Sequence, residues 1–266
     1  MSNIIKFWNW HEIPDDVHPR PAGRPMPQWW QDMYAYGGWG QDGDSTERRV
    51  DVVSGMDNAS IKRCQPIIDS MTLGYVIRTH AELYIESKDN TSAHLTEEVC
   101  PAPSVLTTAT YPRRVTDSPN SGVSFHPFGQ AMEHPYSKKT QQHLLKIFTP
   151  WIVKTAPGYS VIFHSPLNDQ NQYFDVIPGV MDSDQFFPRL NFMIALKDKN
   201  FNGIIPAGTP LVQVIPFKRE KWEMAIDHTK EGMEEFKKRK GKVDATLASV
   251  FHLPYRKWFW SKKEFK

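Results

Sequence analysis

Two carboxylates in one tight turn, and one amide on a nearby strand, are the residues with the clearest capacity for chemistry. Asp182 and Asp184 lie in the run Gly-Val-Met-Asp-Ser-Asp at 179–184, and Gln213 lies in the apolar run 211–217. A carboxylate held in place can orient and deprotonate water, and an amide can donate hydrogen bonds to a polar ligand. The alternative is structural, because Asp commonly accepts backbone N–H bonds in turns and Gln213 can satisfy a neighbouring backbone group.

A metal site is a weaker candidate. His80 and Glu82 are two residues apart in a β-like run and would share one face of a strand, with His126, His134 or His164 as a further ligand. The alternative is that His80 and Glu82 line a polar face of the sheet. The sequence lacks the GxxxxGK[ST], GxSxG and HExxH patterns, and its two cysteines cannot build a zinc ribbon. We therefore expect no metal and no cofactor.

The elements that must position these residues are mostly short strands. Residues 73–85 predict one or two strands, and apolar runs bounded by Pro, Gly, Asn or Asp predict six more. These runs are 144–148, 151–154, 159–164, 174–177, 190–196 and 211–217. Short strands at this spacing are typical of a sandwiched or closed antiparallel architecture. We predict a mainly β protein with a β-clip-like or jelly-roll-like central domain over residues 61–220.

An extended arm is predicted before this domain, over residues 1–60. Its centre is the proline-rich run 19–27, which favours extended backbone over a helix or a central strand. The arm carries the aromatic residues Trp8, Trp10, Trp29 and Trp30, which either pack on their own domain or bind a neighbouring subunit.

A helical segment with a basic and aromatic end is predicted over residues 221–266. Apolar residues recur every three or four positions within 221–239, which indicates an amphipathic helix. A second short element over 243–253 should stop at Pro254. Trp258 and Trp260, among basic residues, could stack on single-stranded nucleic acid, or dock on a partner or on their own domain.

Charge, hydropathy and cysteine content restrict the partners and the cellular compartment that we expect. The 266 residues contain 32 basic and 30 acidic side chains, so no strong overall field attracts nucleic acid. No apolar run is long enough to span a bilayer, and no signal peptide opens the chain. Cys64 and Cys100 are the only cysteines, which favours a reducing compartment, although their pairing stays open. We expect a protein that is neither secreted nor membrane-inserted.

The turn 179–184 and the strand 205–215 resemble the third and fourth motifs of the trimeric dUTPase and dCTP deaminase superfamily, which has the β-clip fold. The resemblance covers about residues 145–220. It implies that Asp182 is the general base for hydrolysis at phosphorus and that Ser165 and Gln213 bind phosphates, with Asp184 beside them. Magnesium would enter with the nucleotide. Phe186 would replace the family's aromatic residue, and His164 stands where the family has arginine.

The whole chain more closely resembles an uncharacterised family encoded by tailed bacteriophages, on segments between residues 60 and 222. That resemblance implies a source and a location in the host cytoplasm or the virion. We expect a non-enzymatic binding or assembly protein that forms homo-oligomers or binds other phage proteins. A dUTPase-like nucleoside triphosphate pyrophosphohydrolase is the first alternative, and a single-stranded nucleic-acid binder is the second.

Overall fold

The computed structural model describes residues 3–9, 13–37, 49, 58–86, 123–126, 128–131, 133–136, 144–169, 171–198, 200–248 and 253–266. Two compact units are present, and each joins two separate stretches of sequence. Unit 1 contains residues 1–24 and 74–219, and unit 2 contains residues 25–73 and 220–266. The boundary predicted after residue 220 lies within one residue of the end of unit 1, whereas the other boundaries of the units fall after residues 24 and 73 and not at residue 60.

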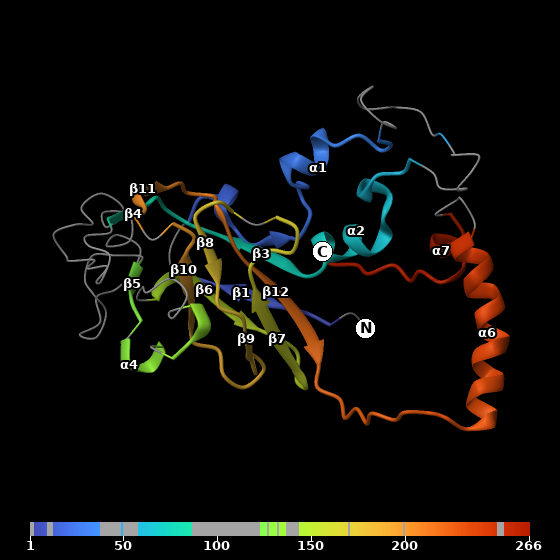
Figure 1. The fold of residues 1–266 in the computed structure, drawn as a ribbon. Helices are drawn as coiled ribbons and strands as arrows, with labels where there is room; N and C mark the ends of the chain where they lie inside the picture. Colours follow the sequence, from blue (N-terminus) through green and yellow to red (C-terminus); the bar gives the residue numbers. More distant parts are fainter. Residues whose placement is uncertain are drawn as a thin grey trace. The chain divides into compact units, whose positions relative to one another are not determined.

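Unit 1 carries the strands (Figure 1). They are β1 (Lys6–Trp8), β2 (Arg20–Pro21), β3 (Tyr75–Arg78), β4 (Leu83–Glu86), β5 (Val123–Phe125), β6 (Leu145–Lys154), β7 (Tyr159–His164), β8 (Phe174–Val176), β9 (Gly179–Met181), β10 (Arg189–Leu196), β11 (Asn202–Ile205) and β12 (Pro210–Lys218). A 3-10 turn, η1 (Asp15–Val17), and a short helix, α4 (Phe128–Ala131), also belong to this unit.

Two antiparallel sheets form the body of unit 1. The first has the order β1-β6-β10-β8, with β5 also paired to β6, and the second has the order β2-β3-β12-β7-β9. Strands β11 and β4 form a separate pair. All of these described pairs are antiparallel. The prediction of a mainly β protein is confirmed at this level.

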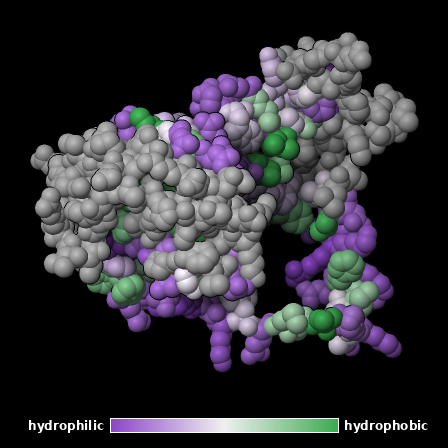
Figure 2. Space-filling view, turned by 60° about the vertical axis from the view of Figure 1, so that its left-hand side comes forward, coloured by the Kyte–Doolittle hydropathy of each residue, from purple (hydrophilic) through white to green (hydrophobic). Residues whose placement is uncertain are grey.

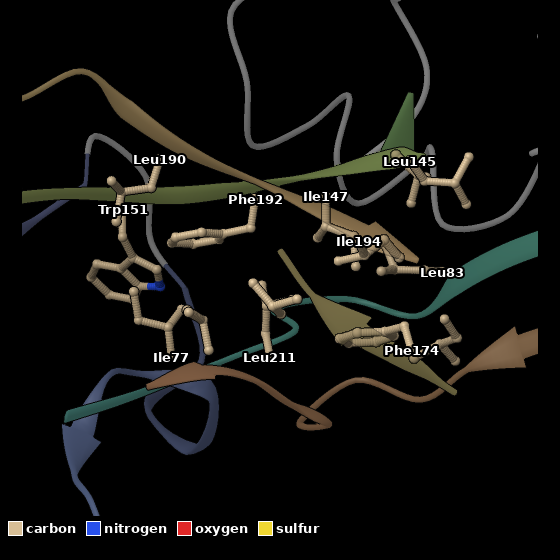
Figure 3. Packing of buried hydrophobic residues seen from close by; sticks show 14 of the residues in the cluster. Ile77, Leu83, Leu145, Ile147, Trp151, Phe174, Leu190, Phe192, Ile194 and Leu211 are labelled. Atoms are coloured by element: carbon tan, nitrogen blue, oxygen red, sulfur yellow. The ribbon is translucent and has the colours of Figure 1, made fainter. Parts of the chain in front are cut away.

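The core lies between the two sheets. Side chains from β6 and β10 face those from β3 and β12, and Figure 3 shows Ile147 and Phe192 on one side with Ile77 and Leu211 on the other. The ring of Phe192 also packs edge-on against Phe163, with centroids 5.2 Å apart. Burial of this apolar surface is the main favourable term in folding.

Strand β6 merges two predicted strands into one. Pro150 separates the apolar runs 144–148 and 151–154, but the ladder with β10 continues past it through a register shift near Leu190. Proline lacks an N–H and is tolerated at such bulges. The Thr149 hydroxyl donates to the Leu190 carbonyl at 3.1 Å and accepts from the Trp151 N–H at 3.3 Å. These bonds replace part of the missing ladder.

The N-terminal stretch is not one extended arm. Residues 6–8 pair with the end of β6, and residues 20–21 pair with β3. Ile13, Val17 and Ala22 are buried, which explains why this stretch packs on the sheets. After Pro27, residues 28–32 form the short helix α1 (Gln28–Asp32), contrary to the expectation of a helix-free arm. Burial of Trp30 accompanies this helix.

Unit 2 contains the described helices outside the β body. They are α1, η3 (Ile61–Arg63), α2 (Gln65–Thr72), α6 (Lys230–Ala248) and α7 (Leu253–Trp258). Residues 61–63 and 65–72, assigned by prediction to the β domain, are therefore helical. Pro66 in the first turn of α2 is well placed there, because its missing N–H would have no partner within the helix.

The C-terminal helix begins later than predicted. Helix α6 covers residues 230–248, whereas 221–239 was expected. The Thr229 hydroxyl accepts from the Gly232 N–H at 3.1 Å, and Asp227 accepts from Thr229, so a capping motif fixes the start. The described part of the element expected at 243–253 lies in α6, up to residue 248, and in α7, at residue 253. Pro254 lies in the first turn of α7, where proline is favoured, and does not end the element.

Candidate functional site

The acidic turn lies where three segments of unit 1 meet. Strand β9 leads into residues 182–185, β12 ends just before Arg219, and the hairpin turn between β6 and β7 contains Gly158. The Arg219 N–H donates to the Gly158 carbonyl at 2.9 Å, which fixes the chain after β12 against the hairpin. The local strand order thus brings a guanidinium to the two carboxylates.

The Asp184 carboxylate accepts hydrogen bonds from both Arg219 and the β6–β7 hairpin. Its carboxylate forms a bidentate pair with Arg219 at 2.9 and 2.5 Å and accepts the Gly158 N–H at 2.8 Å. Only 5% of its side chain is exposed. The hydrogen bonds from Arg219 lower the pKa of Asp184 to about 2, so it stays ionised at neutral pH.

Asp182 is the more accessible carboxylate, with 63% of its side chain exposed. It accepts a 2.6 Å hydrogen bond from the Ser160 hydroxyl, and its Oδ1 lies 3.4 Å from Arg219 Nη1. Between the two carboxylates, buried Ser183 shares a 2.9 Å hydrogen bond with Thr155. We call Ser160, Asp182, Asp184 and Arg219 the Arg219 network.

Ser165 and Gln213 lie at the other end of β7. Gln213 is paired with His164 in the ladder, and its buried Oε1 accepts the Leu167 N–H at 2.8 Å. The Ser165 hydroxyl accepts the Val176 N–H at 2.8 Å. Ser160 and His164 are four residues apart on β7, which corresponds to about 13 Å. The expected meeting of Asp182 with Gln213 therefore does not occur within one chain.

Aromatic side chains lie next to the acidic turn. Phe187 packs edge-on against Trp8 with ring centroids 6.0 Å apart, and Lys154 Nζ lies 4.9 Å from the Phe187 centroid and 5.6 Å from that of Trp8. The exposed fractions are 40% for Trp8, 65% for Phe186 and 38% for Phe187. We call these three residues the aromatic patch. Cation–π contact with Lys154 holds two of its rings in place.

The other tryptophans predicted at interfaces have different surroundings. Trp10 lies outside the described residues. Trp29 is partly exposed and packs edge-on against buried Trp30. Trp258 is exposed, but Trp260 donates to Asp69 Oδ2 at 2.8 Å. The latter contact is within unit 2, in agreement with docking of the tail on its own chain.

Asp69 anchors the C-terminal tail. It also accepts from Lys263 at 2.7 Å and from Gln65 at 2.9 Å, and Lys263 lies over the Trp260 ring. Burial alone would raise the pKa of Asp69, but the hydrogen bonds from Lys263, Gln65 and Trp260 hold it below its ordinary value. Part of the basic and aromatic cluster is thus used for internal contacts.

The possible metal ligands do not converge. His80 and Glu82 lie in the connection between β3 and β4, not on a strand, with His80 buried and Glu82 exposed. No group of three or more His, Cys, Asp or Glu side chains arranged to hold a metal ion occurs among the described residues. Burial, with a contribution from Arg189, lowers the pKa of His80 to about 4. The ring is therefore neutral at neutral pH.

Arg219 and Lys154 are two residues of this region that the sequence did not indicate as site residues. Arg219 follows the last strand directly, and Lys154 ends β6, so neither has a local motif that indicates its partner. Their partners are distant in sequence and are brought close by the pairing of strands. Arg219 and Asp184, for example, are 35 residues apart. Cys64 is a half-buried thiol before α2, while Cys100 lies outside the described residues.

Comparison of the chain with family models, with curated proteins and with solved structures finds no match. In the part of the chain that the structure describes, every helix is too short or too polar to cross a bilayer.

Proposed function

We propose that this chain is a non-enzymatic binding and assembly protein that uses the aromatic patch of unit 1 to contact further copies of itself. The observation that carries the proposal is the partial exposure of Trp8 and Phe187 in a fixed edge-on arrangement. Aromatic residues held rigidly at a surface are the anchors that protein interfaces favour. Lys154 adds a cation that can pair with a carboxylate of a neighbouring subunit.

The state of the carboxylates supports binding over hydrolysis. Arg219 Nη1 lies 3.4 Å from Asp182 Oδ1, and its guanidinium is already neutralised by Asp184. A triphosphate at this turn would meet two carboxylates and little free positive charge. Gln213 is buried and occupied by a loop N–H, about one strand length away. A pyrophosphohydrolase would have to assemble its phosphate ligands from elsewhere.

The packing of two antiparallel sheets is compatible with a β-clip-like or jelly-roll-like domain, which we propose as the specific fold. The resemblance to tailed-bacteriophage proteins is the ground for proposing a phage origin and a place in the virion or the host cytoplasm. Homo-oligomers are common in both settings, and a shared aromatic surface suits repeated subunits.

Removal of the first 40 residues is a poor test, because β1 and β2 belong to the sheets of unit 1. The doubly substituted chain Trp8→Ala, Phe187→Ala removes the patch while leaving the backbone of both sheets. We expect sedimentation velocity to show association of the wild-type chain with rising concentration and at least tenfold weaker association of this variant.

The matched control is Ile204→Ala, which removes a comparably exposed apolar side chain from β11 in the same unit. It should associate like the wild type. A wild-type chain that stays monomeric at high concentration, or a double variant that is folded and associates normally, would contradict the proposal.

A further inference from the structure

Helix α6 exposes apolar side chains along one seam. Met233, Phe236 and Val243 are 45%, 55% and 42% exposed, respectively, and the sequence continues this spacing with Leu247. The intervals of three, seven and four residues correspond to the a and d positions of two heptads, with Lys240 at the intervening a position. Figure 2 shows hydrophobic residues, in green, at the molecular surface among hydrophilic ones in purple. Such spacing is the pattern of a helix that packs against another helix.

The charges beside the seam are arranged for a second copy of the same helix. With Met233 at position a, Arg239 occupies position g and Asp244 occupies position e. In two parallel helices in register, a g residue faces the e residue five positions later in the partner. Arg239 would thus meet Asp244 of the other copy, and the two-fold symmetry forms this pair twice.

The polar residue at the seam is also accommodated. Lys240 forms an ion pair with Asp244 of its own helix, one turn away. Its charged end is therefore held at the edge of the seam, while its aliphatic stem can cover the apolar side chains. Arg239 pairs with Glu235 at 2.6 Å within the helix, an exposed contact of the kind that contributes little and exchanges readily.

From the spacing, the exposure and the charges together, we propose that α6 pairs with α6 of a second copy of this chain as a short parallel two-stranded coiled coil. This interface is separate from the aromatic patch and does not depend on it. The 19 residues of the helix correspond to about 28 Å, so the seam is short and the pairing is expected at elevated protein concentration.

Oxidative cross-linking of the full-length chain tests the pairing. Val243→Cys places a thiol at a d position, where two parallel copies bring it next to itself, and Lys238→Cys places one on the opposite face of the same helix. We expect disulfide-linked dimers from the first variant at several times the yield of the second. The native cysteines contribute equally to both.

Charge reversal gives a second readout. Arg239→Glu and Asp244→Arg should each weaken association by about fivefold in sedimentation equilibrium, and the double variant should restore it. These measurements are made in the Trp8→Ala, Phe187→Ala background, so that a failure of the aromatic patch does not affect the outcome. Equal dimer yields from Val243→Cys and Lys238→Cys would overturn the proposal. So would single charge variants that associate as strongly as the double variant.

Discussion

At the scale of single residues, the polar side chains near the candidate site are engaged with backbone groups and with one another. Arg219 binds Asp184 and also donates to the Tyr159 carbonyl, so it connects the end of β12 to the β6–β7 hairpin. The hypothesis of a turn-capping role for Asp184 agrees with its bond to the Gly158 N–H. The Arg219 network therefore gives Asp184 a structural role at the β6–β7 hairpin.

Buried His80 predicts a pH dependence of stability. Its pKa is about 4 in the folded chain and 6.5 in an exposed histidine, so the unfolded state binds the proton more readily. The folded state is therefore destabilised as the pH falls from 6.5 toward 4, by about 3 kcal/mol in total for this group. Asp184 affects stability at a lower pH, because its stabilising negative charge is lost as the pH falls from 3.8 to about 2.

Urea unfolding of the wild type and His80→Gln at pH 7 and pH 5 measures this effect. The variant should lose much of the pH dependence in this window. His126→Gln should retain most of it, because His126 is only half-buried, although burial and Lys146 also lower its pKa. A His80→Gln chain with the full wild-type pH dependence would show that this histidine is not the cause.

At the scale of elements, two glycines with the same backbone conformation differ in their surroundings. Gly74 has φ +72° and Gly158 has φ +83°, a region that costs other residues about 1 kcal/mol or more. A Cβ on Gly74 would lie 2.3 Å from the Val214 carbonyl oxygen, whereas nothing lies within 4 Å of one on Gly158.

Gly74→Ala should therefore destabilise unit 1 by more than Gly158→Ala, because the close approach of β12 adds to the shared conformational cost. We expect about 1 kcal/mol for Gly158→Ala and at least 2 kcal/mol more for Gly74→Ala in urea unfolding. Equal losses would mean that β3 and β12 are not as close at Gly74 as described.

Much of the element pattern could be predicted from the sequence. The strands near 159–164, 190–196 and 211–217 have compact apolar runs with turn residues at both ends, and their positions are confirmed within a residue or two. Strands β9 and β11 are short and contain glycine, so periodicity does not reveal them. The cap formed by Asp227 and Thr229 fixes the start of α6. The apolar spacing begins further upstream and therefore predicts an earlier start.

At the scale of the whole chain, local patterns could not predict how distant segments combine. Unit 2 joins residues 25–73 to residues 220–266, and Trp260 reaches Asp69 across 191 positions of sequence. The separation of Gln213 from Asp182 also depends on long-range pairing. Strand β12 places Gln213 opposite His164 at one end of β7, whereas β9 places Met181 opposite Val161 near the other end. Nucleic-acid binding by the tail stays a prediction, with Trp258 as one of its exposed aromatic residues.

Hydrogen–deuterium exchange at low and high protein concentration tests the proposed assembly surface most directly. We predict slower deuterium uptake at high concentration in peptides covering residues 4–9 and 183–188, which contain the aromatic patch. Peptides covering the turn at residues 206–209, which is fixed by hydrogen bonds to Thr79, should be unchanged. Equal uptake at both concentrations in the peptides of the aromatic patch would contradict the account.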